Sequence, residues 1–165
     1  MNRIIDRRAR LGAVAPWVST AARLGLAGVF IAAGLLKVVD PQSSVQAVRG
    51  YELLPPTLET AVGWGLPFAE LGLGLLLAAG VFTRVVGALS AGLLLVFIGA
   101  VISAAARGLT IDCGCFGGGG LVAIGETDYG REIARDTGFL LLAVWLIWQP
   151  RSRLSLERTD PEEIT

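Results

Sequence analysis

The two cysteines of this chain are separated by one glycine, as Cys113-Gly114-Cys115. A disulfide needs its two Cα atoms about 4.4–6.8 Å apart, and residues i and i+2 of an extended chain lie at or beyond that limit. Cys113 and Cys115 can therefore bond only where the backbone bends, and Gly114 is the residue most able to bend. The resulting small ring would be strained, and strained disulfides are oxidising and exchangeable. We interpret Cys113 and Cys115 as a catalytic pair for thiol–disulfide exchange.

The residues around this pair suit such chemistry. Glycines at positions 117–120 are expected to leave the loop mobile and the sulfurs open to a partner. Arg107, Arg131 and Arg135 lie on the flanking helix ends, where a positive charge lowers the pKa of a thiol. Asp112 acts in the opposite direction, so no net shift is predicted.

Two other roles for the cysteines compete with exchange. Cysteines often serve as inert packing residues, but such residues are not usually placed as Cys-Gly-Cys in a glycine-rich loop. Thiolate pairs also suit Cu(I) or Zn²⁺. Zinc prefers four ligands, however, and the chain has no histidine, no third cysteine and a single methionine, Met1. Copper handling is the less favoured hypothesis, and no resident metal is expected.

The composition indicates that the cysteine loop is held by a scaffold in a membrane. Apolar residues make up 53% and charged residues 17% of the 165 residues, with a mean hydropathy of +0.65. Ordinary soluble domains contain about 25% charged residues. The charges cluster, with long uncharged runs between them. No basic stripe with interleaved aromatic residues occurs, so nucleic acid is not an expected partner.

The uncharged runs predict an all-α fold, an integral membrane four-helix bundle embedded in the lipid bilayer. Spans are expected at about residues 16–39, 60–82, 85–106 and 129–149, since about 20 residues cross the hydrocarbon core. A cleaved signal peptide is the alternative for the first run, but signals have apolar regions of only about 7–15 residues. A short interfacial helix is expected within residues 41–54. Residues 1–150 then form one domain with a redox loop at 109–128, followed by a cytoplasmic tail at 151–165.

Local signals refine the ends and the packing of these helices. Thr127 or Asp128 is the expected N-cap of the last helix. Small residues recur four positions apart, and such pairs let membrane helices approach closely. We expect these contacts at Gly28/Ala32, Ala88/Gly92, Gly99/Ser103 and Ala100/Ala104.

The basic residues predict that both termini lie in the cytoplasm (N-in, C-in). That orientation places eight arginines inside: Arg3, Arg7, Arg8, Arg10, Arg84, Arg151, Arg153 and Arg158. It leaves five basic residues outside: Lys37, Arg49, Arg107, Arg131 and Arg135. The positive-inside rule favours this orientation. We therefore expect a multi-pass protein of the bacterial cell membrane with an extracytoplasmic cysteine loop.

Three ionisable residues fall within the expected first and second spans: Arg23, Lys37 and Glu70. Such residues are costly in a membrane and are functional candidates by default. At about 1.5 Å per residue, Arg23 and Glu70 differ in depth by about 5–6 Å, so a structural Arg23–Glu70 ion pair is expected. Lys37 lies near the outer end, where its side chain can reach the interface. The alternative is that these residues line a polar cavity for a quinone headgroup or a proton path.

The sequence Cys113-Gly114-Cys115-Phe116-Gly117 resembles the motif of the MauE branch of the DoxX-like membrane proteins. Three further segments agree with it in the expected order: Phe30-x-x-x-Gly34-x-x-Lys37, Tyr51-x-Leu53-Leu54-Pro55 and Pro67-Phe68-Ala69-Glu70-Leu71-Gly72-Leu73-Gly74. The resemblance covers roughly residues 20–140 and implies a four-helix integral membrane protein. It also makes Phe116 and Gly117 supporting residues of the cysteine site.

The resemblance implies a role in disulfide formation or electron transfer on the outer face of the membrane. MauE-like proteins are linked to maturation of methylamine dehydrogenase, whose small subunit is disulfide-rich, and other relatives are partners of exported thioredoxin-like proteins. We predict a thiol–disulfide oxidoreductase, or an electron-relay subunit of one, with an exported thioredoxin-like or disulfide-bonded partner. A membrane quinone is a candidate electron acceptor, although membrane disulfide oxidases generally use two cysteine pairs. A non-catalytic anchor for a redox or maturation complex is the alternative.

Overall fold

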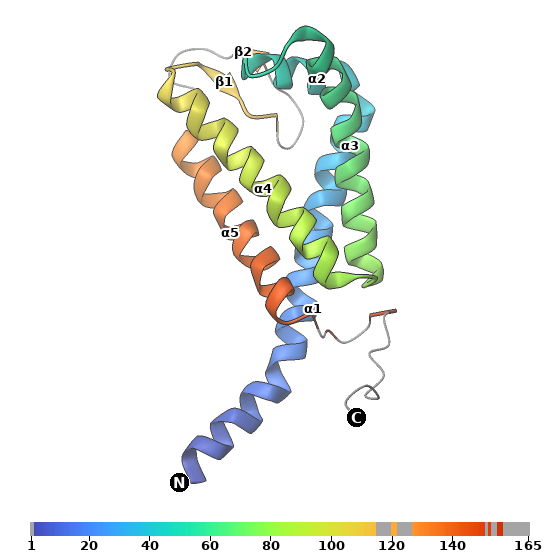
Figure 1. Ribbon diagram of the computed structural model, residues 1–165, viewed down its shortest axis with the longest axis vertical. Coiled ribbons are helices and arrows are strands. Elements are labelled where there is room, and N and C mark those ends of the chain that lie inside the picture. The colour runs from blue at the N-terminus through green and yellow to red at the C-terminus, as the bar shows by residue number, and fades with distance from the viewer. Residues whose placement is uncertain (1, 115–119, 122–126, 151, 153–154, 157–165) are drawn as a thin grey trace.

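The computed structural model describes residues 2–114, 120–121, 127–150, 152 and 155–156. Its elements in chain order are α1 Asn2–Val39, α2 Pro41–Gly50, α3 Pro56–Ala79, α4 Thr83–Ala106, β1 Ile111–Asp112, β2 Gly120–Leu121 and α5 Tyr129–Trp148. The long helices α1, α3, α4 and α5 run alternately up and down (Figure 1). The predicted helical membrane bundle is confirmed, and a short antiparallel pairing of β1 with β2 is added to it.

Within the described residues, three segments are long and apolar enough to cross a membrane: Val14–Val39, Pro56–Ala79 and Thr83–Ala106. Helix α5 is not among them because its first two turns carry Arg131, Glu132, Arg135 and Asp136. From Thr137 onward α5 is uncharged. The outward faces of α3 and α4 are apolar, and Phe68, Leu89 and Val96 are each more than half exposed. In a membrane, these faces contact lipid.

The ends of the helices follow from local chemistry. Asp128 caps α5 by accepting a hydrogen bond from the backbone N–H of Arg131 at 3.0 Å, which confirms one of the two predicted caps. Pro56 opens α3, where the missing N–H of proline costs nothing. Gly80 ends α3 with φ +68°, a left-handed conformation that glycine adopts without a Cβ clash. The turn between α3 and α4 is therefore short, as predicted.

The two ends of the bundle carry different elements. Helix α2 and strands β1 and β2 lie at one end, whereas the N-terminus and the last turn of α5 lie at the other (Figure 1). After α5 the chain returns to α3, because the N–H of Leu156 donates to the carbonyl oxygen of Ala79 at 3.1 Å. This part of the expected tail therefore contacts the bundle, and most of that tail lies outside the described residues.

The apolar core lies between the four long helices. It includes Leu26, Phe30, Leu77, Leu94 and Leu146. Helix α5 is also tied to α1 by hydrogen bonds: Trp145 Nε1 donates to Ser19 Oγ at 3.1 Å, and Ser19 Oγ donates to the carbonyl oxygen of Gln149 at 2.8 Å. The last helix is thus an integral member of the bundle.

The closest approach of α1 and α3 depends on Gly34 and Gly74. A Cβ at Gly34 would lie 2.7 Å from Leu71 Cγ, and one at Gly74 would lie 2.9 Å from a backbone nitrogen of α1. The glycines of the small-residue pairs expected from the sequence do not make such contacts. A Cβ would meet nothing within 4 Å at three of their glycines, Gly28, Gly92 and Gly99. That prediction is wrong at these positions because their Cβ directions point away from neighbouring helices.

Candidate functional site

The cysteine loop begins on a short hairpin that is anchored in the bundle. Ile111 of β1 is fully buried, and β1 pairs antiparallel with β2. Gly114 has φ +64°, in the left-handed region where a side chain is disfavoured. Its N–H donates to Asp112 Oδ1 at 3.2 Å. The bend that the sequence predicts at Gly114 is present, directly after Cys113.

Two tyrosines and an arginine hold the backbone around Cys113. Tyr51, which follows α2, donates its hydroxyl hydrogen to the carbonyl oxygen of Cys113 at 3.3 Å. Arg107, at the end of α4, donates to the carbonyl oxygen of Tyr51. Tyr129, at the start of α5, donates to the carbonyl oxygen of Leu109. Segments far apart in the sequence therefore fix the position of one loop.

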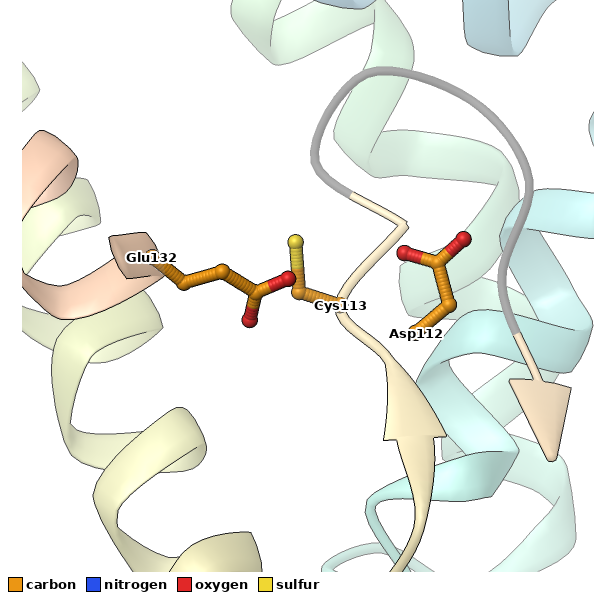
Figure 2. A group of neighbouring side chains, drawn as sticks. All are labelled: Asp112, Cys113 and Glu132. Atoms are coloured by element: carbon orange, nitrogen blue, oxygen red, sulfur yellow. The ribbon is translucent and has the colours of Figure 1, made fainter. Parts of the chain in front are cut away.

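The half-buried side chain of Cys113 lies beside two charged side chains of α5. Figure 2 shows the Glu132 side chain reaching from α5 to Cys113, with Asp112 turned to the other side. The Glu132 carboxyl group shares a hydrogen bond with Cys113. Arg135 places Nη2 3.8 Å from Cys113 Sγ, and its Nε pairs with Asp136 Oδ1 at 3.0 Å. The sulfur thus has both a proton acceptor and a cation in contact.

The protonation of Glu132 is set by its surroundings. Burial raises the pKa of Glu132, whereas its hydrogen bond with Cys113 and the charge of Arg135 oppose that rise. Glu132 lies in the charged first turns of α5, outside the uncharged stretch that begins at Thr137. A carboxyl group of raised pKa can hold the proton that a thiol loses on becoming a thiolate. Glu132 was not predicted from the sequence, although its spacing of three residues from Arg135 places both on one helix face.

Asp112, Cys113 and Glu132 also present one ligand atom each within 4.8 Å of one another. Zinc accepts carboxylate and thiolate ligands but prefers four of them in a structural site. Arg135 lies against the same sulfur and would repel a bound cation. The donor set therefore suits a shared proton and a stabilised thiolate better than a metal ion.

Of the other predicted residues of the cysteine site, some lie in the described part of the chain and some lie outside it. Arg131 is exposed on α5, and its backbone N–H bonds to the capping residue Asp128. Of the two predicted arginines, the structure brings Arg135 to the sulfur of Cys113 and leaves the Arg131 side chain on the exposed face. The remaining predicted residues lie outside the described part of the chain: Cys115, Phe116 and Gly117.

A buried ion pair inside the membrane joins α1 to α3. Lys37 Nζ lies 2.5 Å from Glu70 Oε1, and the two side chains are 4% and 1% exposed. Gly34 and Gly74 let the two helices approach within a turn of these residues. The predicted Arg23–Glu70 pair is therefore wrong, and so is the prediction that Lys37 reaches the interface. Lys37 is the cation at the depth of Glu70.

Arg23 instead binds the C-terminal end of α3. Its Nη1 donates to the carbonyl oxygens of Leu77 at 2.8 Å and Ala78 at 3.1 Å. The last carbonyl groups of a helix lack intrahelical donors, and the helix dipole favours a cation there. Helix α3 ends at Ala79 rather than near residue 82, which brings these carbonyl groups to Arg23. The fully buried guanidinium therefore has a structural role.

A pocket of about 250 Å³ lies between the cysteine site and the Lys37–Glu70 ion pair. Its walls come from α1, α2, α3, α4 and the start of the cysteine loop, and they are almost entirely apolar. Cys113 and Gly114 line it, and so does Lys37, which carries the ion pair to Glu70. The cysteine and the intramembrane lysine therefore share one cavity.

The fold and the site together define a helical membrane protein with a cysteine-bearing hairpin at one end of its bundle. The sequence model of the family described as "Methylamine utilisation protein MauE" matches residues 15–149. The chain belongs to the MauE family, and the resemblance seen in its motifs is confirmed.

One relative gives the degree of similarity. The "Methylamine utilization protein MauE" of Paracoccus denitrificans is 35% identical over 107 residues, which are 64% of this chain and 58% of that protein. The match thus spans less than two thirds of the relative's length. No solved structure matches the chain.

Proposed function

We propose that this MauE-family membrane protein is a thiol–disulfide oxidoreductase, or the electron-relay subunit of one. The observation that carries the proposal is the contact of Cys113 with the carboxyl group of Glu132 and the guanidinium of Arg135. A proton acceptor and a cation beside one sulfur favour the thiolate, which is the nucleophile and the leaving group in disulfide exchange. A cysteine that only fills space needs neither.

The exchange uses the second cysteine, which the sequence places two residues on. A thiolate of an exported thioredoxin-like partner attacks one sulfur of a Cys113–Cys115 disulfide and forms a mixed disulfide. The second thiol of the partner then displaces the remaining cysteine of the pair. Two electrons and two protons pass from the partner's dithiol to Cys113 and Cys115. Arg135 stabilises Cys113 as the thiolate, and Glu132 delivers a proton to it.

The protein is expected to work in the bacterial inner membrane, with both termini in the cytoplasm and the hairpin outside. The excess of arginine near the termini supports this orientation. The helix arrangement supports it too, because the hairpin lies at the opposite end of the bundle from the N-terminus (Figure 1). The family description and the relative's name add methylamine utilisation as the process in which to seek the partner.

Labelling with a membrane-impermeant maleimide in intact cells tests the proposal. We expect Cys113 and Cys115 to be labelled only after reduction, as an outward-facing disulfide. The matched control is Leu156→Cys in the double cysteine-to-serine background, because Leu156 is exposed at the opposite end of the bundle. It should be labelled only after the cells are opened. Labelling of Cys113 only in opened cells, or without prior reduction, would contradict the proposal.

A second variant distinguishes disulfide exchange from the alternative function, a non-catalytic membrane anchor. The double variant Cys113→Ser/Cys115→Ser should abolish oxidation of the partner while the protein still inserts and folds, because the buried pair Lys37–Glu70 is untouched. Full partner oxidation in cells that carry this variant would establish the anchor and reject exchange.

A further inference from the structure

One wall of the apolar pocket beneath the hairpin carries a charged group, the ammonium of Lys37, which the exchange reaction does not use. Lys37 lines the pocket, and its ammonium group lies 5.5 Å from the ring centroid of Phe97, another lining residue. An ammonium group carries three hydrogen-bond donors. Among the described residues, Lys37 uses one of them on Glu70. A buried cation in an apolar pocket is therefore available to donate further hydrogen bonds.

The ion pair decides which kind of ligand this donor suits. Glu70 lies against Lys37 Nζ and is itself buried, so the pair as a whole is neutral. A carboxylate or phosphate placed beside Lys37 would also meet the negative charge of Glu70 in a low-dielectric setting. A neutral oxygen that accepts a hydrogen bond, such as a ring carbonyl, meets no such repulsion. The pocket thus favours an uncharged acceptor with an apolar body.

Exposed lining residues on two apolar helices give the pocket an opening on the lipid-facing surface. Val62 of α3 and Val96 of α4 both line it, and they are 40% and 66% exposed. Both helices are apolar enough to span the membrane, so this mouth opens toward lipid. The volume of about 250 Å³ is slightly below the roughly 300–1,000 Å³ of drug-sized sites. It accommodates one small ring whose tail stays in the lipid.

We propose that the pocket binds a lipid-soluble quinone, which accepts the electrons of the Cys113–Cys115 dithiol. Lys37 would donate a hydrogen bond to one ring carbonyl, and Cys113 lines the same cavity. In the reaction the dithiol loses two electrons and two protons and becomes a disulfide. The quinone gains them and becomes the hydroquinone. This inference rests on the proposed function, since the partner's dithiol supplies the electrons that reduce the cysteine pair.

The test uses the full-length protein in lipid nanodiscs. The chain is reduced with dithiothreitol, freed of it, and mixed without oxygen with a decyl-tailed benzoquinone. Loss of quinone absorbance and the mass of the maleimide-labelled protein are followed together. We expect about one quinone to be reduced per chain, since dithiol oxidation is a two-electron step, and both cysteines to become protected from maleimide.

Two tryptophan variants on one helix face distinguish the pocket from non-specific reaction. Val96→Trp fills the mouth and should slow quinone reduction by about tenfold or more, about 1.4 kcal/mol in the barrier. Leu89→Trp is the matched control, because Leu89 is similarly exposed on α4 and lies outside the pocket. It should react as the unmodified protein does. Equal rates for Val96→Trp and the unmodified protein would overturn the proposal.

Binding without electron transfer gives an independent measurement. Equilibrium dialysis of the same quinone against the double cysteine-to-serine variant should show saturable binding that Lys37→Met or Val96→Trp weakens. Retention of a lipid acyl chain that the quinone cannot displace would overturn the proposal and assign the pocket to lipid.

Failure of this inference can be told from failure of the proposed function. The general thiol oxidant diamide is applied to the reduced protein in parallel. If diamide forms the Cys113–Cys115 disulfide and the quinone does not, the quinone site is rejected and exchange stands. If neither oxidant forms that disulfide, the cysteine pair is not a redox couple and both proposals are rejected.

Discussion

Replacing Arg135 with glutamine removes the positive charge next to Cys113 and keeps a side chain of comparable length. The guanidinium lies 3.8 Å from the sulfur. Two unit charges at that distance attract by about 1 kcal/mol in water and about 4 kcal/mol at an effective dielectric constant of 20. The Arg135 side chain is 31% exposed and also pairs with Asp136, so the attraction lies near the weaker of these two values. We expect the thiolate to lose about 1.4 kcal/mol of stabilisation, a tenfold shift of its equilibrium with the thiol.

The assay is the rate of alkylation by iodoacetamide as a function of pH. In a Cys115→Ser background, Cys113 is the only thiol. Arg135→Gln should move the midpoint of this profile up by about one pH unit. Below both midpoints the rate should fall by only about threefold, because a less acidic thiol forms a more reactive thiolate. Above both midpoints the variant should be faster by about the same factor, so the two curves cross.

Arg131→Gln is the matched control, since it removes the same charge from the exposed face of the same helix. Its profile should superimpose on that of the parent protein. An unchanged midpoint in Arg135→Gln would show that the guanidinium does not stabilise the thiolate. An equal shift in Arg131→Gln would show that the effect is one of overall charge and not of the contact with Cys113.

Three further predictions concern the membrane pair, the helix packing and the proton acceptor. Lys37→Met leaves Glu70 buried without its cation and should cost about 3 kcal/mol or more of stability in detergent unfolding; adding Glu70→Leu should recover most of it, and no recovery would contradict a pairwise role. Gly34→Leu should lower the unfolding temperature strongly and Gly28→Leu hardly at all; equal effects would contradict the packing described. In the reverse half-reaction, where the Cys113 thiol attacks a disulfide, Glu132 accepts the thiol proton only above its raised pKa, so the rate at which the reduced protein reacts with a disulfide in stopped-flow measurements should rise with pH through that value. Glu132→Gln should reduce that rise, and an unchanged pH profile would contradict this role.

The bundle could be predicted from the sequence because its signals are local. Long uncharged runs mark the spans, and Asp128 and Gly114 act on their own neighbours as a cap and a bend. Each of these signals depends on residues close together in the chain. The last helix was also recognisable from its uncharged second half, despite the charges in its first two turns.

The partners of buried charges could not be predicted because they depend on helix rotation and on where each helix ends. Span boundaries from hydropathy placed Arg23 close enough in depth to Glu70 for an ion pair, whereas α3 ends early enough for Arg23 to reach its last carbonyl groups. Lys37 faces Glu70 because two glycines set the contact between α1 and α3. The contact of Glu132 with Cys113 likewise depends on a hairpin that two tyrosines hold in place. Periodicity in the sequence does not predict such a contact.

Disulfide exchange requires that Cys113 and Cys115 form covalent intermediates with an exported protein. Trapping tests it most directly: cells that express Cys113→Ser, Cys115→Ser or the double variant are quenched with acid and run on non-reducing gels. In a single variant the remaining thiolate can attack the disulfide of the oxidised partner, and no second cysteine of this chain carries the exchange forward. At least one single variant should therefore carry an adduct that dithiothreitol releases, and the double variant should carry none. Absence of a reducible adduct from both single variants, or its persistence in the double variant, would show that exchange does not proceed through these cysteines.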